Sequence, residues 1–203
     1  MLETEYKRLL TADEYNKIAA HFDWDSVKEQ TNHYYGDEDK ILANNRVMFR
    51  VRVKGGKSVI QVKLHKNADS PLQICEELEY PIDGVPEVIE NGEKYTGIKT
   101  GTLKNLGCTV TLRHSKMWDS QTEICLDKTE YLGITDYEIE IEYTDEHEDS
   151  RGIEPLSSSA LLRKSSQKIP EKLSAELNAL GVEFKENSVG KYTRFLRALE
   201  NNN

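Results

Sequence analysis

Hydrophobic and polar residues alternate with a period of two along most of this chain. This spacing is typical of β-strands that have one apolar and one polar face. Between residues 46 and 54, for example, Val47 and Phe49 fall on one predicted face, while Arg50 and Arg52 fall on the other. On the same grounds, strands are predicted at residues 2–10, 31–35, 46–54, 59–65, 72–82, 109–118, 123–130 and 137–144.

Local start and stop signals lie between these strands. The run Lys54-Gly55-Gly56-Lys57 predicts a hairpin turn. Thr11 and Glu14 form the capping-box pattern that begins a helix. Further helices are predicted as two short ones within 86–106, interrupted by glycines, and as longer ones at 170–180 and 189–199. The remaining predictions are a loop at 145–150 and a helix or mobile segment at 157–167.

The polar faces of the predicted strands carry charges that are sorted by strand. The acidic faces contain Glu3, Glu5, Glu77, Glu79, Glu138, Glu140 and Glu142. The basic faces contain Arg50, Arg52, Lys63 and Arg113. A surface that serves only solubility tends to mix the two signs within each strand. We therefore interpret these faces as the lining of a shared lumen that binds a bipolar ligand, with amphipathic helices covering the apolar faces.

The first strand places Glu3, Glu5 and Lys7 on one face, because alternate residues of a strand point the same way. Two carboxylates and an ammonium group suit a hard divalent cation such as Mg²⁺ beside a phosphate chain. Taken alone, this triplet is more typical of a solvated edge strand. The alternating glutamates at 138–142 could likewise belong to a strand with one wet face. The metal–phosphate interpretation depends on finding all of these residues together.

Composition narrows the possible class of protein. The chain has 203 residues, enough for a single domain with its own core, and its net charge of -9 argues against a general nucleic-acid binder. Cys75, Cys108 and Cys125 are odd in number and far apart, which argues against a disulfide framework or a zinc site. We expect a cytoplasmic protein without a signal peptide or membrane span, and a monomer or homodimer.

The ordered set of motifs resembles the CYTH domain, a family also called the triphosphate tunnel metalloenzymes. The matching segments are ExExK at 3–7, FRVR at 49–52, VKL around Lys63, ExE at 77–79, TLR ending at Arg113, EIEIE at 138–142 after Leu132-Gly133, and KYTR at 191–194. The likeness spans residues 2–199 and is strongest to small bacterial members. It implies an α+β, mainly β fold: a closed eight-stranded antiparallel β-barrel, or tunnel, with helices packed outside.

The resemblance also implies a domain organisation and roles for the matching residues. A single domain would span 1–203, with most of the barrel in 1–145 and covering C-terminal helices in 155–200. Mg²⁺ or Mn²⁺ would be held by Glu3, Glu5, Glu138 and Glu140, with Glu142 as a further candidate. Phosphate oxygens would be bound by Lys7, Arg50, Arg52, Lys63 and Arg113.

Three predicted residues have more than one possible role. Glu77 and Glu79 would complete a second metal site or orient the attacking water. Lys191 would contact the substrate as part of a lid over the tunnel mouth, or lie on a solvated basic helix face. One position departs from the family, because Cys75 stands where many members have a basic residue. The missing cation could be supplied by Arg46, Lys54 or Arg194.

The favoured function is metal-dependent hydrolysis of a small-molecule triphosphate, with Lys7 as a point charge near the scissile end. Inorganic triphosphate is the preferred substrate, because the lumen is polar and no base-recognition motif is evident. Alternatives are thiamine triphosphatase activity, class IV-type adenylyl cyclase activity, or a non-catalytic module that binds polyphosphate or nucleotide. A cyclase would need an adenine pocket, for which Tyr34, Tyr35 and Phe49 are the candidates.

Overall fold

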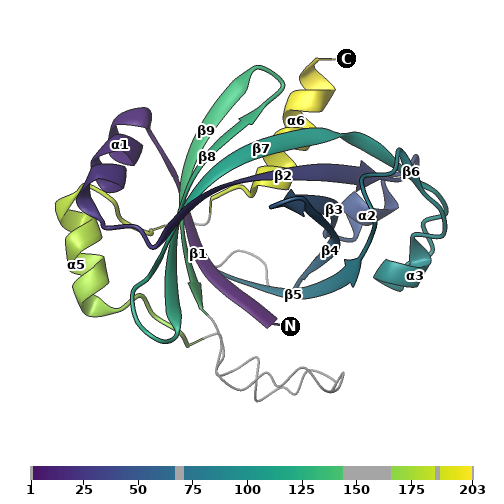
Figure 1. Ribbon diagram of the computed structural model, residues 1–203. Coiled ribbons are helices and arrows are strands. Elements are labelled where there is room, and N and C mark those ends of the chain that lie inside the picture. The colour runs from purple at the N-terminus through teal and green to yellow at the C-terminus, as the bar shows by residue number, and fades with distance from the viewer. Residues whose placement is uncertain (1, 67–70, 144–165, 186–187, 203) are drawn as a thin grey trace.

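The computed structural model describes residues 2–66, 71–143, 166–185 and 188–202. Within these residues the chain forms a closed β-barrel with helices packed against it (Figure 1). The loop predicted at 145–150, and all but the last residues of the segment predicted at 157–167, lie outside the described part of the chain.

Eight strands close the barrel, and each pairs antiparallel with its neighbours. They are β1 (Leu2–Leu10), β2 (Ser26–Gly36), β3 (Val47–Lys54), β4 (Lys57–His65), β5 (Leu72–Pro81), β7 (Leu103–Met117), β8 (Thr122–Tyr131) and β9 (Ile134–Tyr143). Their order is β2-β3-β4-β5-β1-β9-β8-β7, and the pairing of β7 with β2 closes the ring. The short β6 (Val88–Ile89) pairs with the first residues of β7. The predicted eight-stranded antiparallel barrel is confirmed.

The barrel is charged inside and apolar outside, as the alternation of residue types predicts. On β3, Phe49 and Val51 are buried in an outer apolar cluster, whereas Arg50 and Arg52 line the lumen. The β3–β4 hairpin sets the register of this sheet, because Gly55 and Gly56 take the positive φ values of 57° and 75° that its tight turn requires. A slip of one residue would exchange the two faces.

Two outer clusters of apolar side chains hold helices against the barrel (Figure 1). One packs α1 (Ala12–His21) and α5 (Glu171–Ala179) over β8 and β9. The predicted capping box of α1 is present, with both reciprocal hydrogen bonds between Thr11 and Glu14. The other cluster packs α2 (Ile41–Asn44) and residues of the β6–α3 region over β3 and β4.

The last helix, α6 (Lys191–Asn201), contacts residues that point into the barrel rather than away from it. Its fully buried Phe195 packs with Tyr34, Met48 and Tyr131. In Figure 1 this yellow helix lies between the β8–β9 and β2–β3 sides of the barrel. The first turn of α6 is therefore positioned to project side chains into the lumen.

Two predictions of local structure were wrong. The strand β2 begins at Ser26 instead of 31. Its first half forms a strand because it pairs with the long β7. The sequence did not predict this half because it is polar and lacks alternating apolar residues. The region 86–106 contains β6 and the four-residue α3 (Glu93–Thr96) instead of two helices. Gly97 takes a left-handed φ of 68° directly after α3, and residues from 103 onward already belong to β7.

Candidate active site in the barrel

A cavity of about 840 Å³ occupies the barrel lumen, and the charged strand faces converge on it. Among the predicted site residues it is lined by Glu3, Glu5, Lys7, Arg50, Arg52, Lys63, Glu77, Glu79, Arg113, Glu140, Glu142 and Lys191. Glu138 shares their interior face but lies beneath the lining, with 1% of its surface exposed. The structure thus brings the predicted residues together, while their roles stay predictions.

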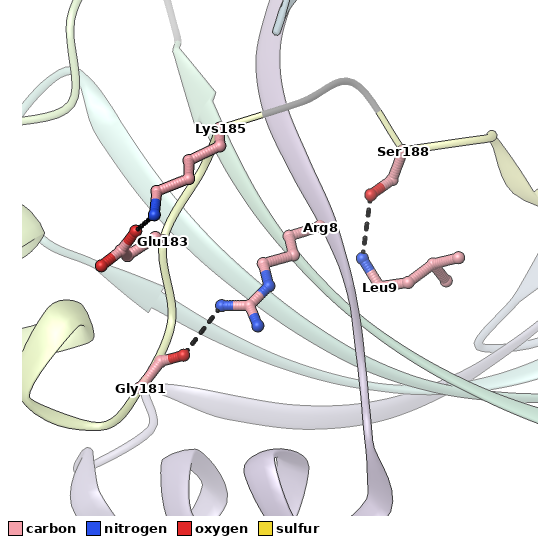
Figure 2. Close-up of a pocket in the computed structure, with 6 residues that line it drawn as sticks. All are labelled: Arg8, Leu9, Gly181, Glu183, Lys185 and Ser188. Carbon is pink, nitrogen blue, oxygen red and sulfur yellow. Dashed lines mark hydrogen bonds and ion pairs between the residues drawn. The ribbon is translucent and has the colours of Figure 1, made fainter.

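A second, smaller cavity of about 420 Å³ lies outside the barrel, between β1 on one side and residues 181–185 and Ser188 on the other (Figure 2). Its charged side chains are engaged with neighbouring groups. Arg8 donates a hydrogen bond of 3.0 Å to the carbonyl oxygen of Gly181, and Lys185 pairs with Glu183. The backbone amide of Leu9 donates to the hydroxyl of Ser188 over 3.1 Å. These contacts tie the segment after α5 to β1, and we assign the cavity a structural role.

Strand pairing sets opposite charges directly across from one another in the lumen. Lys7 on β1 faces Glu140 on β9, and its Nζ lies 3.0 Å from the Glu140 carboxylate. Lys63 on β4 faces Glu77 on β5 at 3.5 Å. Because these pairs are largely buried, each charge depends on its partner and not on water for compensation. The lumen therefore holds positive and negative side chains in fixed positions next to one another before any ligand binds.

Three carboxylates from β1 and β9 form what we call the β1 triad: Glu3, Glu5 and Glu142. Their oxygen atoms lie within 4.8 Å of one another, and Glu5 faces Glu142 across the strand pair. Burial raises the pKa of Glu142 to about 7, and repulsion from Glu140, Glu3 and Glu5 adds to this effect. The nearby Arg113 does not fully offset it. Glu3 and Glu5 contact Lys63 and Lys7, but these two cations also contact Glu77 and Glu140. The β1 triad is thus incompletely compensated by the protein itself.

A second group, the α6 triad, consists of Asp127, Glu138 and Glu140, whose oxygen atoms also lie within 4.8 Å of one another. Here Lys191 of α6 supplies a cation. Its Nζ lies 2.8 Å from Asp127 and 3.0 Å from Glu140, and it also contacts Glu138. Arg194 approaches Glu138 from the next turn of the helix at 2.8 Å. Two α6 cations therefore neutralise this group from within the protein.

The pKa values within the α6 triad reflect this internal compensation. Burial alone would raise the pKa of Glu140, but Lys191, Lys7 and Arg113 outweigh it and hold that pKa well below its usual range. The pKa of Asp127 is lowered despite burial, chiefly by Arg113 and Lys191. Burial raises the pKa of Glu138. Lys191 itself is buried against these carboxylates, with 11% of its side chain exposed, and does not lie on a solvated helix face.

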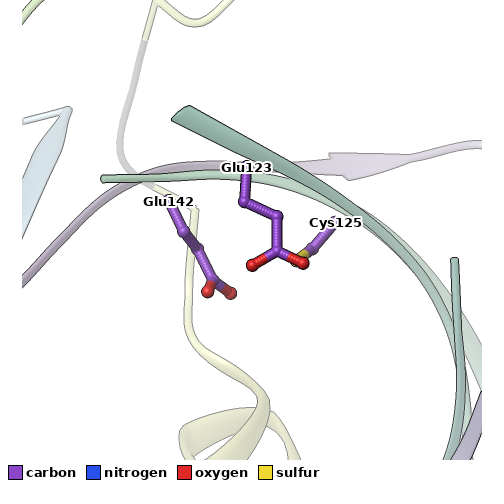
Figure 3. A group of neighbouring side chains, drawn as sticks. All are labelled: Glu123, Cys125 and Glu142. Carbon is purple, nitrogen blue, oxygen red and sulfur yellow. The ribbon is translucent and has the colours of Figure 1, made fainter. Parts of the chain in front are cut away.

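Glu142 also belongs to a third group, with Glu123 and Cys125 on β8 (Figure 3). The two carboxylates lie side by side because Glu123 faces Glu142 across the β8–β9 pair. Burial raises the pKa of the Cys125 thiol well above its usual range, and a sulfur ligand suits soft metal ions and not a hard cation such as Mg²⁺. We therefore take the β1 triad as the better candidate for a cation site.

The opposite wall of the cavity carries Arg50 and Arg52 on β3. Arg50 donates through Nε to Gln61, at 2.7 Å, and Arg52 donates through Nε to Asn32, at 2.9 Å. These neutral partners orient the two guanidinium groups. Arg50 also lies 3.9 Å from the Glu77 carboxylate, whereas the hydrogen bond of Arg52 to Asn32 leaves its charge uncancelled. Burial lowers the pKa of Arg52 to about 10, and repulsion from Arg50 and Arg113 contributes. The wall carries excess positive charge and is suited to an anion.

The two glutamates of β5 differ in their environment. Glu77 is buried and lies near Lys63 and Arg50, whose charges lower its pKa although burial opposes the shift. Glu79 is more exposed and accepts a hydrogen bond from Gln61. Glu77 is therefore an ionised acceptor inside the cavity, whereas Glu79 lies at a more solvated part of its wall.

The three residues proposed to replace the basic residue missing at position 75 lie in different places. Arg46 lines the cavity, with a left-handed φ of 58° just before β3. Arg194 is engaged with Asp136 and Glu138, at 2.7 and 2.8 Å, and Lys54 is exposed at the β3–β4 hairpin. Cys75 lines the cavity itself, with its sulfur 3.1 Å from Nδ1 of His65.

The candidates for an adenine pocket do not share one location. Tyr34 lines the cavity but packs between Tyr192 and Phe195 of α6. Tyr35 and Phe49 are fully buried in the outer cluster over β3 and β4, so the suggestion that they recognise adenine is wrong. Their side chains point away from the lumen.

Sequence reasoning assigned no site role to several lumen residues. Asp127 binds Arg113 through two contacts of 2.8 and 2.7 Å, and Gln61, Asn32 and His65 line the cavity. The alternation along the predicted strands placed Asp127, Gln61 and His65 on the polar faces. This was the one feature of the sequence that could have identified them as lumen residues. Asn32 lies within the strand predicted at 31–35, and its amide gave no signal of a site role.

Comparisons with known proteins identify the family to which this barrel belongs. Residues 1–172 match the family model of the CYTH domain. The chain is 31% identical over 163 residues to a Bacillus subtilis (strain 168) protein named "Putative triphosphatase YjbK", and the match covers 76% of this chain and 84% of the relative. Within the part of the chain that the structure describes, no helix is long and apolar enough to cross a membrane.

Solved structures share the fold at lower identity. HpAC1 from Hippeastrum, described as a "Putative adenylyl cyclase" that "reveals a dominant triphophatase activity", superposes with a TM-score of 0.68 at 19% identity, covering 96% of this chain and 95% of that one. PH1819 from Pyrococcus horikoshii OT3 superposes with a TM-score of 0.60 at 21% identity, covering 96% and 98%. At these identities the likeness establishes the fold alone.

Proposed function

The chain belongs to the CYTH domain family, and we propose that it hydrolyses a triphosphate in its barrel with the help of a divalent cation. Inorganic triphosphate is the proposed substrate. The observation that carries the proposal is the presence, in one cavity, of excess positive charge at Arg52 and of the incompletely compensated β1 triad. A metal–polyphosphate complex carries both complementary charges.

Substrate binding is proposed to fall to the basic residues of the lumen. Arg50 and Arg52 can each present a planar, forked donor to two phosphate oxygens, while Lys63 acts as a point charge. Arg113 is proposed to bind phosphate as well, although it is already held by Asp127 and Glu142. We expect it to contribute less free energy to substrate binding than Arg52, whose charge is not cancelled by a bound carboxylate.

Mg²⁺ or Mn²⁺ is the proposed cofactor, and the β1 triad has a suitable donor set. Its three carboxylates offer oxygen ligands within 4.8 Å of one another, which hard cations prefer. A bound cation would neutralise charge on the phosphates and polarise the bond that breaks. Glu140, which lines the cavity, and Glu138 behind it remain proposed as further ligands.

Lys7 is proposed to act as a fixed positive charge and not as a base. Burial opposes its protonated form, but Glu140 and Glu5 hold the pKa of Lys7 well above its usual range. Its ammonium group lies 2.7 Å from Glu5, so it sits beside the β1 triad, where it can stabilise charge that develops on a phosphate oxygen. The ionised Glu77 is proposed to orient the attacking water, with Glu79 in support.

The comparisons support a triphosphatase more than a cyclase. The Bacillus relative and the Hippeastrum protein are both described in terms of triphosphatase activity. In this chain Tyr35 and Phe49 lie outside the lumen and cannot recognise adenine. Thiamine triphosphatase activity and binding without turnover remain as outcomes of the test below. A cytoplasmic location and a monomeric or homodimeric state complete the proposal.

The test is release of phosphate by the purified protein with Mg²⁺ or Mn²⁺. We expect the fastest release from tripolyphosphate, slower release from thiamine triphosphate and ATP, and no cyclic AMP by mass spectrometry. Lys7→Ala should abolish release, and exposed Lys17→Ala on α1 should leave it unchanged. Tight tripolyphosphate binding without release under either metal would instead support a non-catalytic module. Absence of both binding and release would overturn the proposal.

A further inference from the structure

His65 and Cys75 form a side-chain pair in the wall of the cavity that has no role in the mechanism above. They face each other on the adjacent strands β4 and β5, and both line the cavity. The Cys75 sulfur lies 3.1 Å from Nδ1 of His65. Only 2% of Cys75 is exposed, whereas His65 is exposed. The thiol is thus held behind the imidazole, which meets the contents of the lumen.

The chemistry of the two groups sets the direction of their hydrogen bond. A thiol is ordinarily protonated at neutral pH, and Cys75 is almost completely buried, so the sulfur keeps its proton. An imidazole nitrogen lone pair is a stronger acceptor than a thiol sulfur. The Cys75 thiol therefore donates to Nδ1 of His65. In a neutral imidazole whose Nδ1 accepts, the ring proton is on Nε2.

The surroundings keep His65 neutral in the free protein. Although part of the ring is exposed, its desolvation at the cavity wall lowers its pKa, and the cations Lys7 on β1, Lys63 on β4 and Arg46 before β3 add to the effect. Glu5 on β1 opposes it only in part. His65 therefore stands among cations that attract an anion, and it can offer a hydrogen-bond donor there without adding a further repelling charge.

We propose that His65 is a phosphate-binding residue of the cavity, which donates through Nε2 to a phosphate oxygen, and that Cys75 is the positioning residue that fixes this tautomer. The proposal rests on the triphosphate function proposed above and adds a neutral donor to the basic residues of the cavity. It predicts that Cys75 affects phosphate binding only through the proton that its thiol donates to His65. A hydroxyl group at position 75 should therefore act in the same way.

The first test reads the tautomer directly by ¹⁵N-detected NMR of the histidine side chains in wild-type protein without metal, with His65→Asn used to assign the signal. We expect the Nε2–H tautomer in wild type and in Cys75→Ser, and a mixture of both tautomers in Cys75→Ala. An Nδ1–H tautomer in wild type would overturn the proposal. This measurement needs neither catalysis nor a destabilising variant.

The second test measures tripolyphosphate binding by calorimetry with a chelator present, so that turnover does not interfere. His65→Ala should weaken binding about tenfold, as expected for one hydrogen bond to a charged group. Cys75→Ala should weaken it about threefold and Cys75→Ser less than about twofold, because only the donor's orientation is affected. Wild-type affinity in a folded His65→Ala would overturn the proposal.

His21→Asn is the matched control, because His21 lies on α1 and contacts Glu176 at 3.5 Å, away from the cavity. If the protein turns over triphosphate, His65→Ala should raise KM about tenfold with kcat nearly unchanged, since the donor binds ground state and transition state alike. If wild type binds tripolyphosphate but releases no phosphate, the hydrolase proposal fails while the tautomer and binding tests of His65 still stand.

Discussion

The two acidic triads of the lumen contain the same kinds of side chain, yet their charges are compensated differently. The α6 triad receives Lys191 and Arg194 from the last helix, and the pKa values of Asp127 and Glu140 are lowered, although burial raises that of Glu138. Each carboxylate of the β1 triad contacts one cation (Lys63, Lys7 or Arg113), but each of these cations is shared with a carboxylate outside the triad, and the pKa of Glu142 is raised to about 7. Glu140 and Glu142 stand only two residues apart on β9.

This difference shows that a row of glutamates does not by itself identify a metal site. Each carboxylate of β9 faces the lumen by strand alternation. Whether it can bind a metal ion depends on whether a basic side chain already occupies the space beside it. In the α6 triad an ammonium group takes the place that a cation could hold. We infer that the β1 triad is left for an external cation, because Lys63, Lys7 and Arg113 each also contact a carboxylate outside the triad and the pKa of Glu142 stays raised.

The largest expected effect comes from removing the cation of the α6 triad. Lys191→Ala leaves three buried carboxylates without their shared partner, and we expect a loss of about 3–5 kcal/mol in the free energy of unfolding. Urea unfolding without metal measures it. Added Mg²⁺ should restore part of the loss in this variant, because the α6 triad would then resemble the β1 triad.

The matched control is Lys40→Ala. Lys40 pairs with Glu200 at 2.8 Å on the exposed surface, and its removal should leave stability nearly unchanged. If Lys191→Ala is as stable as Lys40→Ala, then the compensation assigned to α6 is incorrect.

The second prediction concerns the β1 triad, where removing a charge should have the opposite effect on stability. We expect Glu142→Gln to reduce phosphate release on the order of 100- to 1000-fold, because a metal-binding charge is lost. Its unfolding free energy without metal should rise or stay the same, since repulsion from Glu140 and the other triad members is relieved. Exposed Glu130→Gln on β8 is the control. A clear loss of metal-free stability in Glu142→Gln would contradict this contrast.

The third prediction tests the anion-binding wall that faces the β1 triad. Arg52→Ala should raise KM for tripolyphosphate about 10- to 100-fold, as hydrogen bonds to charged groups contribute about 1.5–3 kcal/mol. Arg52→Lys should recover part of the affinity, since it keeps the charge but loses the fork. Lys54→Ala, on the same strand at the exposed hairpin, should bind normally. Equal KM values for the two alanine variants would remove Arg52 from the site.

The smallest effect is a pH dependence that distinguishes the triads. Glu142 has a folded pKa of about 7, above the value near 4.3 expected for the unfolded chain. The folded state therefore binds the extra proton, and this group's contribution to stability is greatest at low pH and is lost as pH rises toward 7. Without metal, wild type should lose about 1–2 kcal/mol relative to Glu142→Gln between pH 5.5 and 7.

Chemical unfolding of both proteins across this pH range measures the difference. Saturating Mg²⁺ should remove it, because a bound cation favours the ionised carboxylate. A constant difference from pH 5.5 to 7 in metal-free buffer would mean that Glu142 is ionised throughout, as Glu140 is.

Strand alternation predicted which side chains share the interior, because the two faces of a strand such as β3 differ sharply. Arg50 and Arg52 line the cavity and Phe49 and Val51 do not, as their positions in the sequence indicate. The hairpin at Gly55 and the capping box at Thr11 were predictable for the same reason: their signals are local.

The state of each charge could not be predicted, because it depends on contacts between distant segments. Glu138 and Glu142 have the same parity and the same type of neighbours along β9. Only the packing of α6 against the lumen shows that Lys191 and Arg194 reach Glu138, whereas Glu142 meets Glu3 and Glu5. The first half of β2 was not predicted for the same reason: it forms a strand chiefly because it pairs with β7, which is distant in the sequence.

The position of β1 in the barrel has a consequence for how the protein is made. Its two partners are β5 and β9, with Tyr6 opposite Leu72 on one side and Ile141 on the other. At a synthesis rate of about 5–20 residues per second, β1 waits on the order of ten seconds on the ribosome for its second partner. During that wait its charged face, with Glu3, Glu5 and Lys7, would deter the strand from pairing with other nascent chains. Residues that we assign to catalysis would thus first serve as protection against aggregation.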